Sequence, residues 1–236
     1  LGRAAAQLLA AHGASLALVD ILGEEVEELA RELGSGTRAF AADLSQVFEI
    51  QAVVGAVVEH FGGIDVLINN AGLGRGYDSL AAASREDISR TIETNVTAAI
   101  HVVHALLPGM LARQRGHLVN LGSIAGLYPM PAALYSASKG ALHLLSQGLR
   151  MELKGSAVRC TEICPARVRT EFFDTAFDDP TKAAQAALGF DLLEPSDIAD
   201  AILYALDAPW RVNVSTIEIT PTEQYIGGVY IEPVGR

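Results

Sequence analysis

The sequence alternates between two patterns along its length, and this alternation restricts the fold more than any other feature. Short apolar runs rich in β-branched residues predict strands, and the longer segments between them predict helices. The predicted strands lie at 15–20, 37–44, 64–72, 116–123, 157–164 and 215–220, and the predicted helices at 3–12, 24–34, 46–60, 84–112, 134–154 and 196–208. Such alternation is typical of βαβ units. We therefore predict an α/β, Rossmann-type fold, with a doubly wound parallel sheet in three layers and a single domain over 1–236.

The first predicted helix has no strand before it, although each later helix follows one. In a dinucleotide-binding βαβ unit, a central strand leads into a glycine-rich turn before the first helix. We therefore expect the first strand to be missing from this sequence, which would begin inside that turn. Residues 1–10 should not form a complete phosphate-binding turn.

Charge and composition argue against several classes of partner. The formal net charge is −11 and no run of Lys or Arg compensates it, so nucleic acid and anionic membranes are poor candidates. Apolar stretches are interrupted before the roughly 18 residues that a membrane span needs, and no signal peptide is visible. Cys160 and Cys164 lie about 13 Å apart if extended, too far for a disulfide. We expect a cytoplasmic protein without a bound metal.

A tyrosine and a lysine four residues apart form the strongest chemical signal. Tyr135 and Lys139 lie in "ALYSASKGAL", inside a predicted helix, so their side chains share one face. A free phenol has a pKa near 10, and an adjacent ammonium favours its ionised form. We expect the pKa of Tyr135 to be lowered toward the working pH, as suits a general acid/base.

Four further motifs accompany this pair. They are "INNAG" at the end of a predicted strand, "TNVTAAIHVV" with Asn95, "HLVNLGSIAG" with Ser123, and the later "CPARVRTEF". In their order along the chain, these four motifs and the motif of Tyr135 and Lys139 closely resemble the short-chain dehydrogenase/reductase family of nicotinamide-dependent oxidoreductases. The resemblance runs from Leu1 to about Gln224.

The resemblance implies a role for each catalytic candidate. Tyr135 would exchange a proton with the substrate oxygen during hydride transfer, and Ser123 would hold and polarise that oxygen. Lys139 would also hydrogen-bond the nicotinamide ribose, and Asn95 would keep a water near the lysine. Taken singly, Ser123 could instead cap a turn and Asn95 could bind backbone.

The resemblance also implies a cofactor site. Gly2 resembles the last glycine of the family's TGxxxGxG turn, Asp43 the acid that contacts the adenine, and Val168 and Thr170 the residues that meet the carboxamide. Ala166 stands where glycine is usual, which costs little if its φ is negative. The full predicted set is Gly2, Asp20, Asp43, Leu44, Asn69, Asn70, Ala71, Gly72, Tyr135, Lys139, Pro165, Val168 and Thr170.

The choice of cofactor is predicted from Asp20, which ends the strand "SLALVD". An acid there can accept hydrogen bonds from the adenosine ribose and would face the 2′-phosphate of NADP. Two like charges about 4 Å apart repel by roughly 4 kcal/mol at an effective dielectric near 20. We therefore expect NAD to be preferred over NADP. The alternative is an acid that caps the turn before the next helix.

The segment 171–194 would be a flap over the substrate, and it is rich in apolar residues. A pocket could be lined by Phe172, Phe173, Phe177 and Phe190 together with Leu127, Tyr128 and Met130. These rings could equally pack the flap onto the core or form an oligomer contact. A small, apolar alcohol or carbonyl substrate is expected.

These features predict an NAD-dependent oxidoreductase that interconverts an alcohol and a carbonyl. The alternative is a catalytically idle relative that serves as a dinucleotide sensor or scaffold, which the intact Asn95, Ser123, Tyr135 and Lys139 disfavour. A sugar-nucleotide epimerase is disfavoured by NNAG and by the short C-terminal part. We expect a homodimer or homotetramer joined through the helices 84–112 and 134–154.

Overall fold

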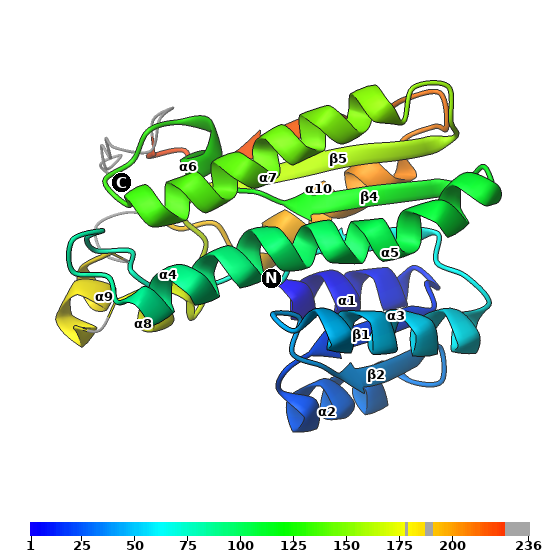
Figure 1. The fold of residues 1–236 in the computed structure, drawn as a ribbon, viewed down its shortest axis with the longest axis horizontal. Coiled ribbons are helices and arrows are strands. Elements are labelled where there is room, and N and C mark those ends of the chain that lie inside the picture. Colours follow the sequence, from blue (N-terminus) through cyan, green and yellow to red (C-terminus); the bar gives the residue numbers. More distant parts are fainter. Residues whose placement is uncertain (178, 187–190, 225–236) are drawn as a thin grey trace.

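The computed structural model describes residues 1–177, 179–186 and 191–224, and it confirms the predicted alternation (Figure 1). The strands are β1 (Leu16–Asp20), β2 (Thr37–Ala41), β3 (Val66–Asn69), β4 (Gly116–Leu121), β5 (Val158–Pro165) and β6 (Thr216–Ile219). The helices are α1 (Gly2–Ala11), α2 (Gly23–Leu33), α3 (Val47–Phe61), α4 (Arg85–Ile92), the π-helical turn η1 (Glu93–Thr97), α5 (Ala98–Ala112), α6 (Ile124–Leu127), α7 (Ala133–Glu152), α8 (Phe172–Ala176), α9 (Pro180–Ala186) and α10 (Pro195–Asp207). The short helices α6, α8 and α9 were not predicted from the sequence.

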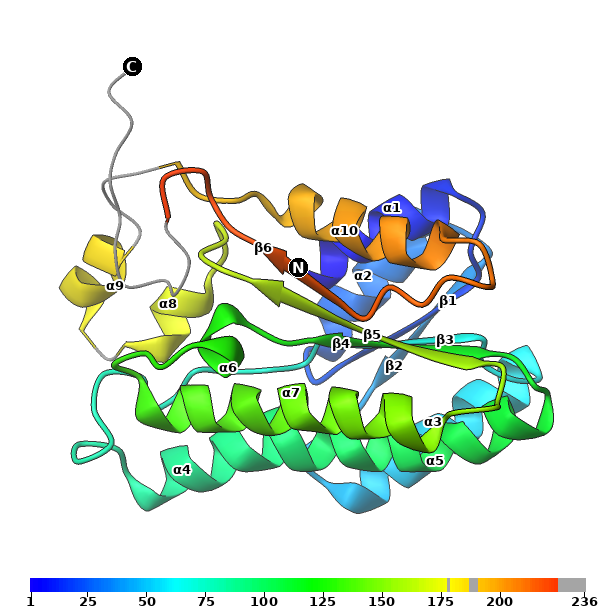
Figure 2. The same ribbon diagram turned by 90° about the horizontal axis from the view of Figure 1, so that it is seen from above.

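All strand pairings between these elements are parallel. Hydrogen bonds join β1 to β2 and, separately, β3, β4, β5 and β6 in that order, so the described strands form two sheets where one was predicted. Figure 2 shows α1 and α10 on one face of the strands and α3, α5 and α7 on the other. This is the predicted three-layer, Rossmann-type arrangement.

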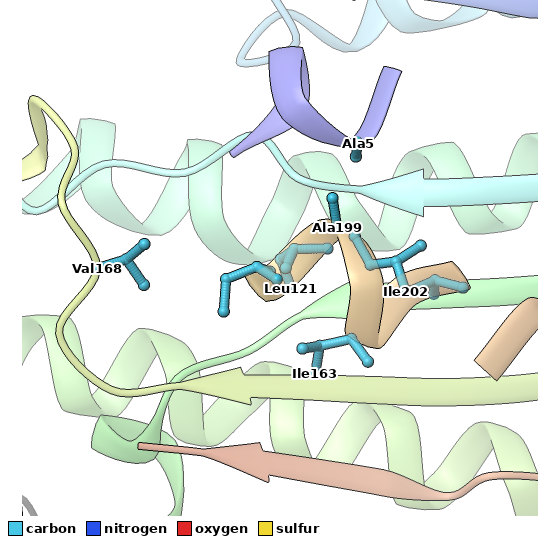
Figure 3. Packing of buried hydrophobic residues seen from close by; sticks show 8 residues of the cluster. Ala5, Leu121, Ile163, Val168, Ala199 and Ile202 are labelled. Atoms are coloured by element: carbon cyan, nitrogen blue, oxygen red, sulfur yellow. The ribbon is translucent and has the colours of Figure 1, made fainter. Parts of the chain in front are cut away.

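The core lies on both faces of β4 and β5. Ala5 of α1 and Ala199 of α10 pack against Leu121 of β4 and Ile163 of β5 on one face (Figure 3). On the opposite face, helices α5 and α7 pack against the same two strands through Val103, Met110, Leu118, Leu149 and Cys160. Every residue of β4 is buried, as expected for a central strand of a parallel sheet. Burying each large aliphatic side chain contributes about 1.5–3 kcal/mol.

The chain begins as a helix, as predicted. Residues 2–11 form α1, so residues 1–10 build no phosphate-binding turn. Gly2 lies against the residue that follows β3, because a Cβ added to it would come within 2.9 Å of Nδ2 of Asn70.

Helices α4, η1 and α5 run continuously from Arg85 to Ala112. By length and composition this 28-residue run could cross a membrane, a test that core helices of soluble proteins also pass. Its apolar residues Val103 and Met110 pack on the sheet beside Leu118. Core packing therefore accounts for part of its apolar character.

Candidate active site

A cavity of about 130 Å³ opens at the edge where β3, β4 and β5 end. Because the strands are parallel, their carboxyl ends meet at this edge, which is where ligands bind in open α/β sheets. Figure 2 shows α6 and α8 at the same end of the molecule. Eight predicted site residues line the cavity: Asn70, Gly72, Ser123, Tyr135, Lys139, Pro165, Val168 and Thr170.

Helix α7 brings Tyr135 and Lys139 to the cavity one helical turn apart. Lys139 is only 5% exposed, and its Nζ donates a hydrogen bond to the backbone oxygen of Leu121 at 2.8 Å. The same nitrogen lies 5.9 Å from the centre of the Tyr135 ring. The helix packs very closely on α6, since a Cβ added to Gly126 would lie 2.6 Å from the Lys139 backbone oxygen.

Burial dominates the ionisation of both groups. It lowers the pKa of Lys139 to about 8, against the opposing influence of Cys164 and Glu162. It raises the pKa of Tyr135, although a hydrogen bond with Ser123 acts in the opposite direction. In the polypeptide alone, the adjacent ammonium therefore does not lower the pKa of Tyr135 as expected. The physical reason is desolvation, together with a lysine whose nitrogen binds a backbone carbonyl.

Ser123 follows β4 and serves two purposes at once. Its Oγ accepts a hydrogen bond from the backbone N–H of Ala125 at 3.1 Å, which caps α6. A hydroxyl has one donor and two acceptor sites, so this cap leaves capacity for a second partner. The turn-capping alternative is thus compatible with a position beside Tyr135 in the cavity wall.

Asn95 lies behind the cavity, in the π-helical turn η1. Its Oδ1 accepts from the Leu73 N–H at 2.8 Å, and its Nδ2 donates to the Leu73 carbonyl at 2.8 Å and to Ser138 Oγ at 3.0 Å. The side chain therefore binds backbone, which is the simpler of the two expectations. It holds the loop after β3, where a Cβ on Gly72 would lie 3.4 Å from both Asn95 Oδ1 and Lys139 Nζ.

The other predicted cofactor residues lie away from this cavity or support its edge. Asn69 donates from Nδ2 to Asn120 Oδ1 at 2.9 Å and so links β3 to β4, while Ala71 is exposed. Asp43 follows β2 and accepts from the Ser45 N–H at 2.9 Å. Leu44 packs into the core near Ile50 and Val53.

Aromatic rings cover one side of the cavity. Phe172 lies 5.2 Å from the Tyr135 ring and 5.8 Å from Tyr77, between ring centres, and Phe173 also lines the cavity. Phe177 packs on Tyr77 at 5.4 Å. Phe172 and Phe173 therefore line the cavity, and both also pack on neighbouring rings.

Of the other residues predicted to line the substrate pocket, some line the cavity and others do not. Met130 lines the cavity, whereas Leu127 is absent from its described wall and the Tyr128 hydroxyl donates to Glu218 at 2.9 Å. Phe190 lies outside the described residues. Ala166 lines the cavity without strain, because Gln114 is the one described non-glycine residue with positive φ.

Among the wall residues that were not predicted from the sequence are Tyr77 and Arg167. Burial raises the pKa of Tyr77, and the positive charge of Arg167, in the same cavity wall, opposes that rise. A cation between Pro165 and Val168, in a motif otherwise apolar up to that point, was a signal that could have been used. Tyr77 lies in a loop that carries no such signal.

Comparison with known proteins identifies similar sequences and structures. The chain is 36% identical over 211 residues to the NADP-dependent 3-hydroxy acid dehydrogenase YdfG of Salmonella typhi, covering 88% of this chain and 85% of that protein. The closed form of serine dehydrogenase complexed with NADP⁺ matches with a TM-score of 0.91 and 31% identity, over 98% of this chain and 94% of that one. A metagenomic short-chain oxidoreductase in complex with NADP matches with a TM-score of 0.78 and 28% identity, over 93% and 91%.

These relatives contradict the predicted preference for NAD, which is wrong. One is named NADP-dependent, and two of the similar structures hold NADP. The structure supplies a physical reason in Asp20, whose Oδ1 accepts a hydrogen bond from the Leu22 N–H at 3.1 Å. The carboxylate caps the turn after β1, which is the alternative use of this acid.

The family follows from a match over most of the sequence. The family model described as short chain dehydrogenase matches residues 1–181. The matched region holds the Tyr135–Lys139 pair, Ser123 and the three strand ends that form the cavity. The chain belongs to the short-chain dehydrogenase family of oxidoreductases.

Proposed function

We propose that this chain is an NADP-dependent oxidoreductase that interconverts the hydroxyl and carbonyl forms of a small hydroxy acid. The observation that carries the proposal is the convergence of Ser123, Tyr135 and Lys139 on one cavity that also has Arg167 in its wall. The relatives named above for 3-hydroxy acids and serine support the substrate class.

The cavity fits the nicotinamide half of a dinucleotide. Small residues at the strand ends let a flat ring approach the backbone, since side chains at Gly72 would crowd Asn95 and Lys139. When bound, the nicotinamide accepts or supplies the hydride and, in its oxidised form, adds positive charge to the site. Lys139, Pro165, Val168 and Thr170 would hold it.

The protein's own groups would move the proton. Because burial keeps the Tyr135 phenol protonated, it can donate its proton to an oxygen that gains negative charge during reduction. Ser123, hydrogen-bonded with Tyr135, would hold the same oxygen. Donors fixed in a buried site stabilise developing charge more strongly than water does.

Arg167 would pair with the carboxylate of the substrate. Burial lowers the pKa of this guanidinium, and the neighbouring Tyr77 opposes that change, so its charge lies in a partly desolvated wall. A planar guanidinium suits bidentate carboxylate binding. Met130, Phe172 and Phe173 are apolar residues of the same wall. We therefore replace the expected apolar substrate by a substrate that has an apolar part and a carboxylate.

The test compares hydroxy acids with matching alcohols that lack the carboxylate. Arg167→Met should raise KM for 3-hydroxy acids at least tenfold, on the order of one lost charged hydrogen bond, and leave neutral alcohols unaffected. Arg169→Met is the matched control, because Arg169 is 61% exposed and pairs with Glu194 at 2.7 Å. Equal loss on both substrate series would contradict the carboxylate role.

The cofactor is tested on the wild-type protein with one substrate. We expect kcat/KM to be higher with NADP than with NAD. A higher value with NAD would contradict the cofactor assignment while leaving the substrate test intact.

We also propose a homodimer or homotetramer that joins through α5 and α7. Three large apolar side chains on these helices are exposed in the single chain: Ile100 is 43% exposed, Leu144 67% and Met151 79%. Light scattering should show a mass of at least twice 24.9 kDa at micromolar concentration. A Leu144→Asp variant should shift that mass downward, and a wild type that stays monomeric would contradict the proposal.

A further inference from the structure

We propose that His143, Glu162 and Cys164 form a binding site for a zinc-like divalent transition metal, directly behind the loop that carries Ser123. Their ligand atoms all lie within 4.8 Å of one another. The site is separate from the proposed chemistry at Tyr135 and does not depend on it.

Two elements bring these side chains together. Glu162 and Cys164 are two residues apart on β5, so they point to the same face of the sheet. His143 follows Lys139 by four residues on α7 and therefore extends the Tyr135–Lys139 row by one turn. The packing of α7 on this face of β5 closes the cluster.

The buried carboxylate of Glu162 is the strongest indication of a cation site. The side chain is completely buried, and its Oε2 lies 2.6 Å from Nδ1 of His143. Its other oxygen, Oε1, is also buried and has no hydrogen-bond partner of good geometry among the residues that the structure describes, although the Cys164 thiol interacts with this carboxylate. Gly122 makes room for this oxygen, because a Cβ there would collide with it. A buried carboxylate oxygen without a partner is costly, and a metal ion would satisfy it.

The surrounding charge also favours a cation. The carboxylates of Glu162 and Glu218 both act on the Cys164 thiol. Glu218 is the residue paired with Cys164 on the adjacent strand β6. The Lys139 ammonium also interacts with Cys164 and Glu162, but its Nζ is held by the Leu121 carbonyl at 2.8 Å.

The donor set selects the metal. Imidazole nitrogen, thiolate sulfur and carboxylate oxygen suit zinc and its neighbours, whereas magnesium and calcium prefer oxygen alone. Bonds of about 2.0–2.3 Å in a tetrahedral site place the donors about 3–4 Å apart, a small change from the observed cluster. Water would complete the four ligands.

Binding releases one proton. The Cys164 S–H bond breaks as the metal–sulfur bond forms, and that proton leaves to solvent. The proton shared between His143 Nδ1 and Glu162 moves to His143 Nε2, which lies 2.8 Å from the Gln147 side-chain amide. With its amide flipped, Gln147 can accept a hydrogen bond from this Nε2–H through its side-chain oxygen, which would fix the tautomer that binds metal.

The test uses the full chain, first treated with a chelator and then titrated with Co²⁺. We expect saturable 1:1 binding with a near-ultraviolet thiolate-to-cobalt absorption band, and displacement of that band by Zn²⁺. Cys164→Ser should abolish the band. Cys160→Ser is the matched control, because Cys160 is a buried free thiol on the same strand and should keep the band.

A second variant tests the site independently, in case Cys164→Ser does not fold. His143, whose side chain is 19% exposed, can be changed to Gln. Calorimetry with Zn²⁺ should then show at least about a 100-fold loss of affinity. A residue that only contacts a metal ligand, without binding the metal itself, is expected to cost about 10- to 100-fold. Absence of saturable binding, a cobalt band that survives Cys164→Ser, or unchanged zinc affinity in His143→Gln would overturn the proposal.

Discussion

Replacing Lys139 by methionine should make the protein more stable while it removes activity. The ammonium is 5% exposed, and one hydrogen bond, from Nζ to the Leu121 carbonyl, compensates part of its desolvation. Methionine has a similar length and no charge. The variant therefore removes a buried cation without opening a large cavity.

The magnitude follows from the pKa of Lys139. Burial lowers it from 10.5 to about 8, which at about 1.4 kcal/mol per pH unit is a cost of about 3 kcal/mol at neutral pH. Losing the hydrogen bond to Leu121 lowers the free energy of unfolding of the variant by about 1 kcal/mol. We expect a net gain of about 2 kcal/mol in the free energy of unfolding, or a rise of about 0.7 M in the urea midpoint for an m-value near 3 kcal/mol/M.

The assay is urea unfolding in the absence of dinucleotide, monitored by circular dichroism and repeated at several pH values. Between pH 8 and 10.5 the unfolded state keeps the lysine proton that the folded state has lost, so wild-type stability should rise with pH. The advantage of Lys139→Met should therefore shrink above pH 8 and turn into a loss of about 1 kcal/mol near pH 10.5, where only the missing hydrogen bond to Leu121 still counts. Lys154→Met, at an exposed lysine after α7, controls for loss of one charge. A Lys139→Met variant less stable than wild type at pH 7, or an advantage independent of pH, would refute the reasoning.

Two further predictions concern the frame of the site. Burial lowers the pKa of His117 to about 4, so its stabilising contribution is complete above about pH 6.5 and is lost as the pH falls toward 4, by up to about 3 kcal/mol. His117→Gln should flatten urea-unfolding stability across this range, and an unchanged slope would contradict the assignment. Gly126→Ala should lower both Tm and turnover, the latter at least tenfold, because its Cβ would press on the Lys139 backbone oxygen. Gly148→Ala, on helix α7 that also carries Lys139, has open space around its Cβ and should be neutral or stabilising. Equal damage from both changes would rule out the packing argument.

Periodicity predicted the regular elements because their burial follows the chain's own pattern. Buried strands such as 116–121 are continuous apolar runs, and the helices between them carry apolar residues at helical spacing. The π-helical turn at Glu93–Thr97 was not predictable, because it depends on how Asn95 meets the backbone of Leu73. The short helices α8 and α9 carry too few residues for a period to be recognised.

The candidate site shows the same division. Tyr135 and Lys139 were predictable from their helical spacing, and Ser123 from its place after a predicted strand in the order of the motifs. The direction of the Tyr135 pKa was not, because burial depends on the whole fold. Asp20 misled for a similar reason: its carboxylate binds the Leu22 N–H, a contact that composition does not reveal. The cavity role of Arg167 likewise depends on how the segment after β5 folds toward Tyr77.

The central claim is that Tyr135 transfers the proton in a hydride-transfer reaction, and the Tyr135→Phe variant tests it most directly. Loss of the hydroxyl should lower kcat for a 3-hydroxy acid at least about 100-fold, the contribution expected of a general acid/base. Because the ring and its packing on Phe172 remain, the Kd for NADP should change less than about threefold. Single-turnover kinetics and dinucleotide fluorescence measure the two quantities on the same preparation. A variant that keeps a third of the wild-type rate would contradict the account.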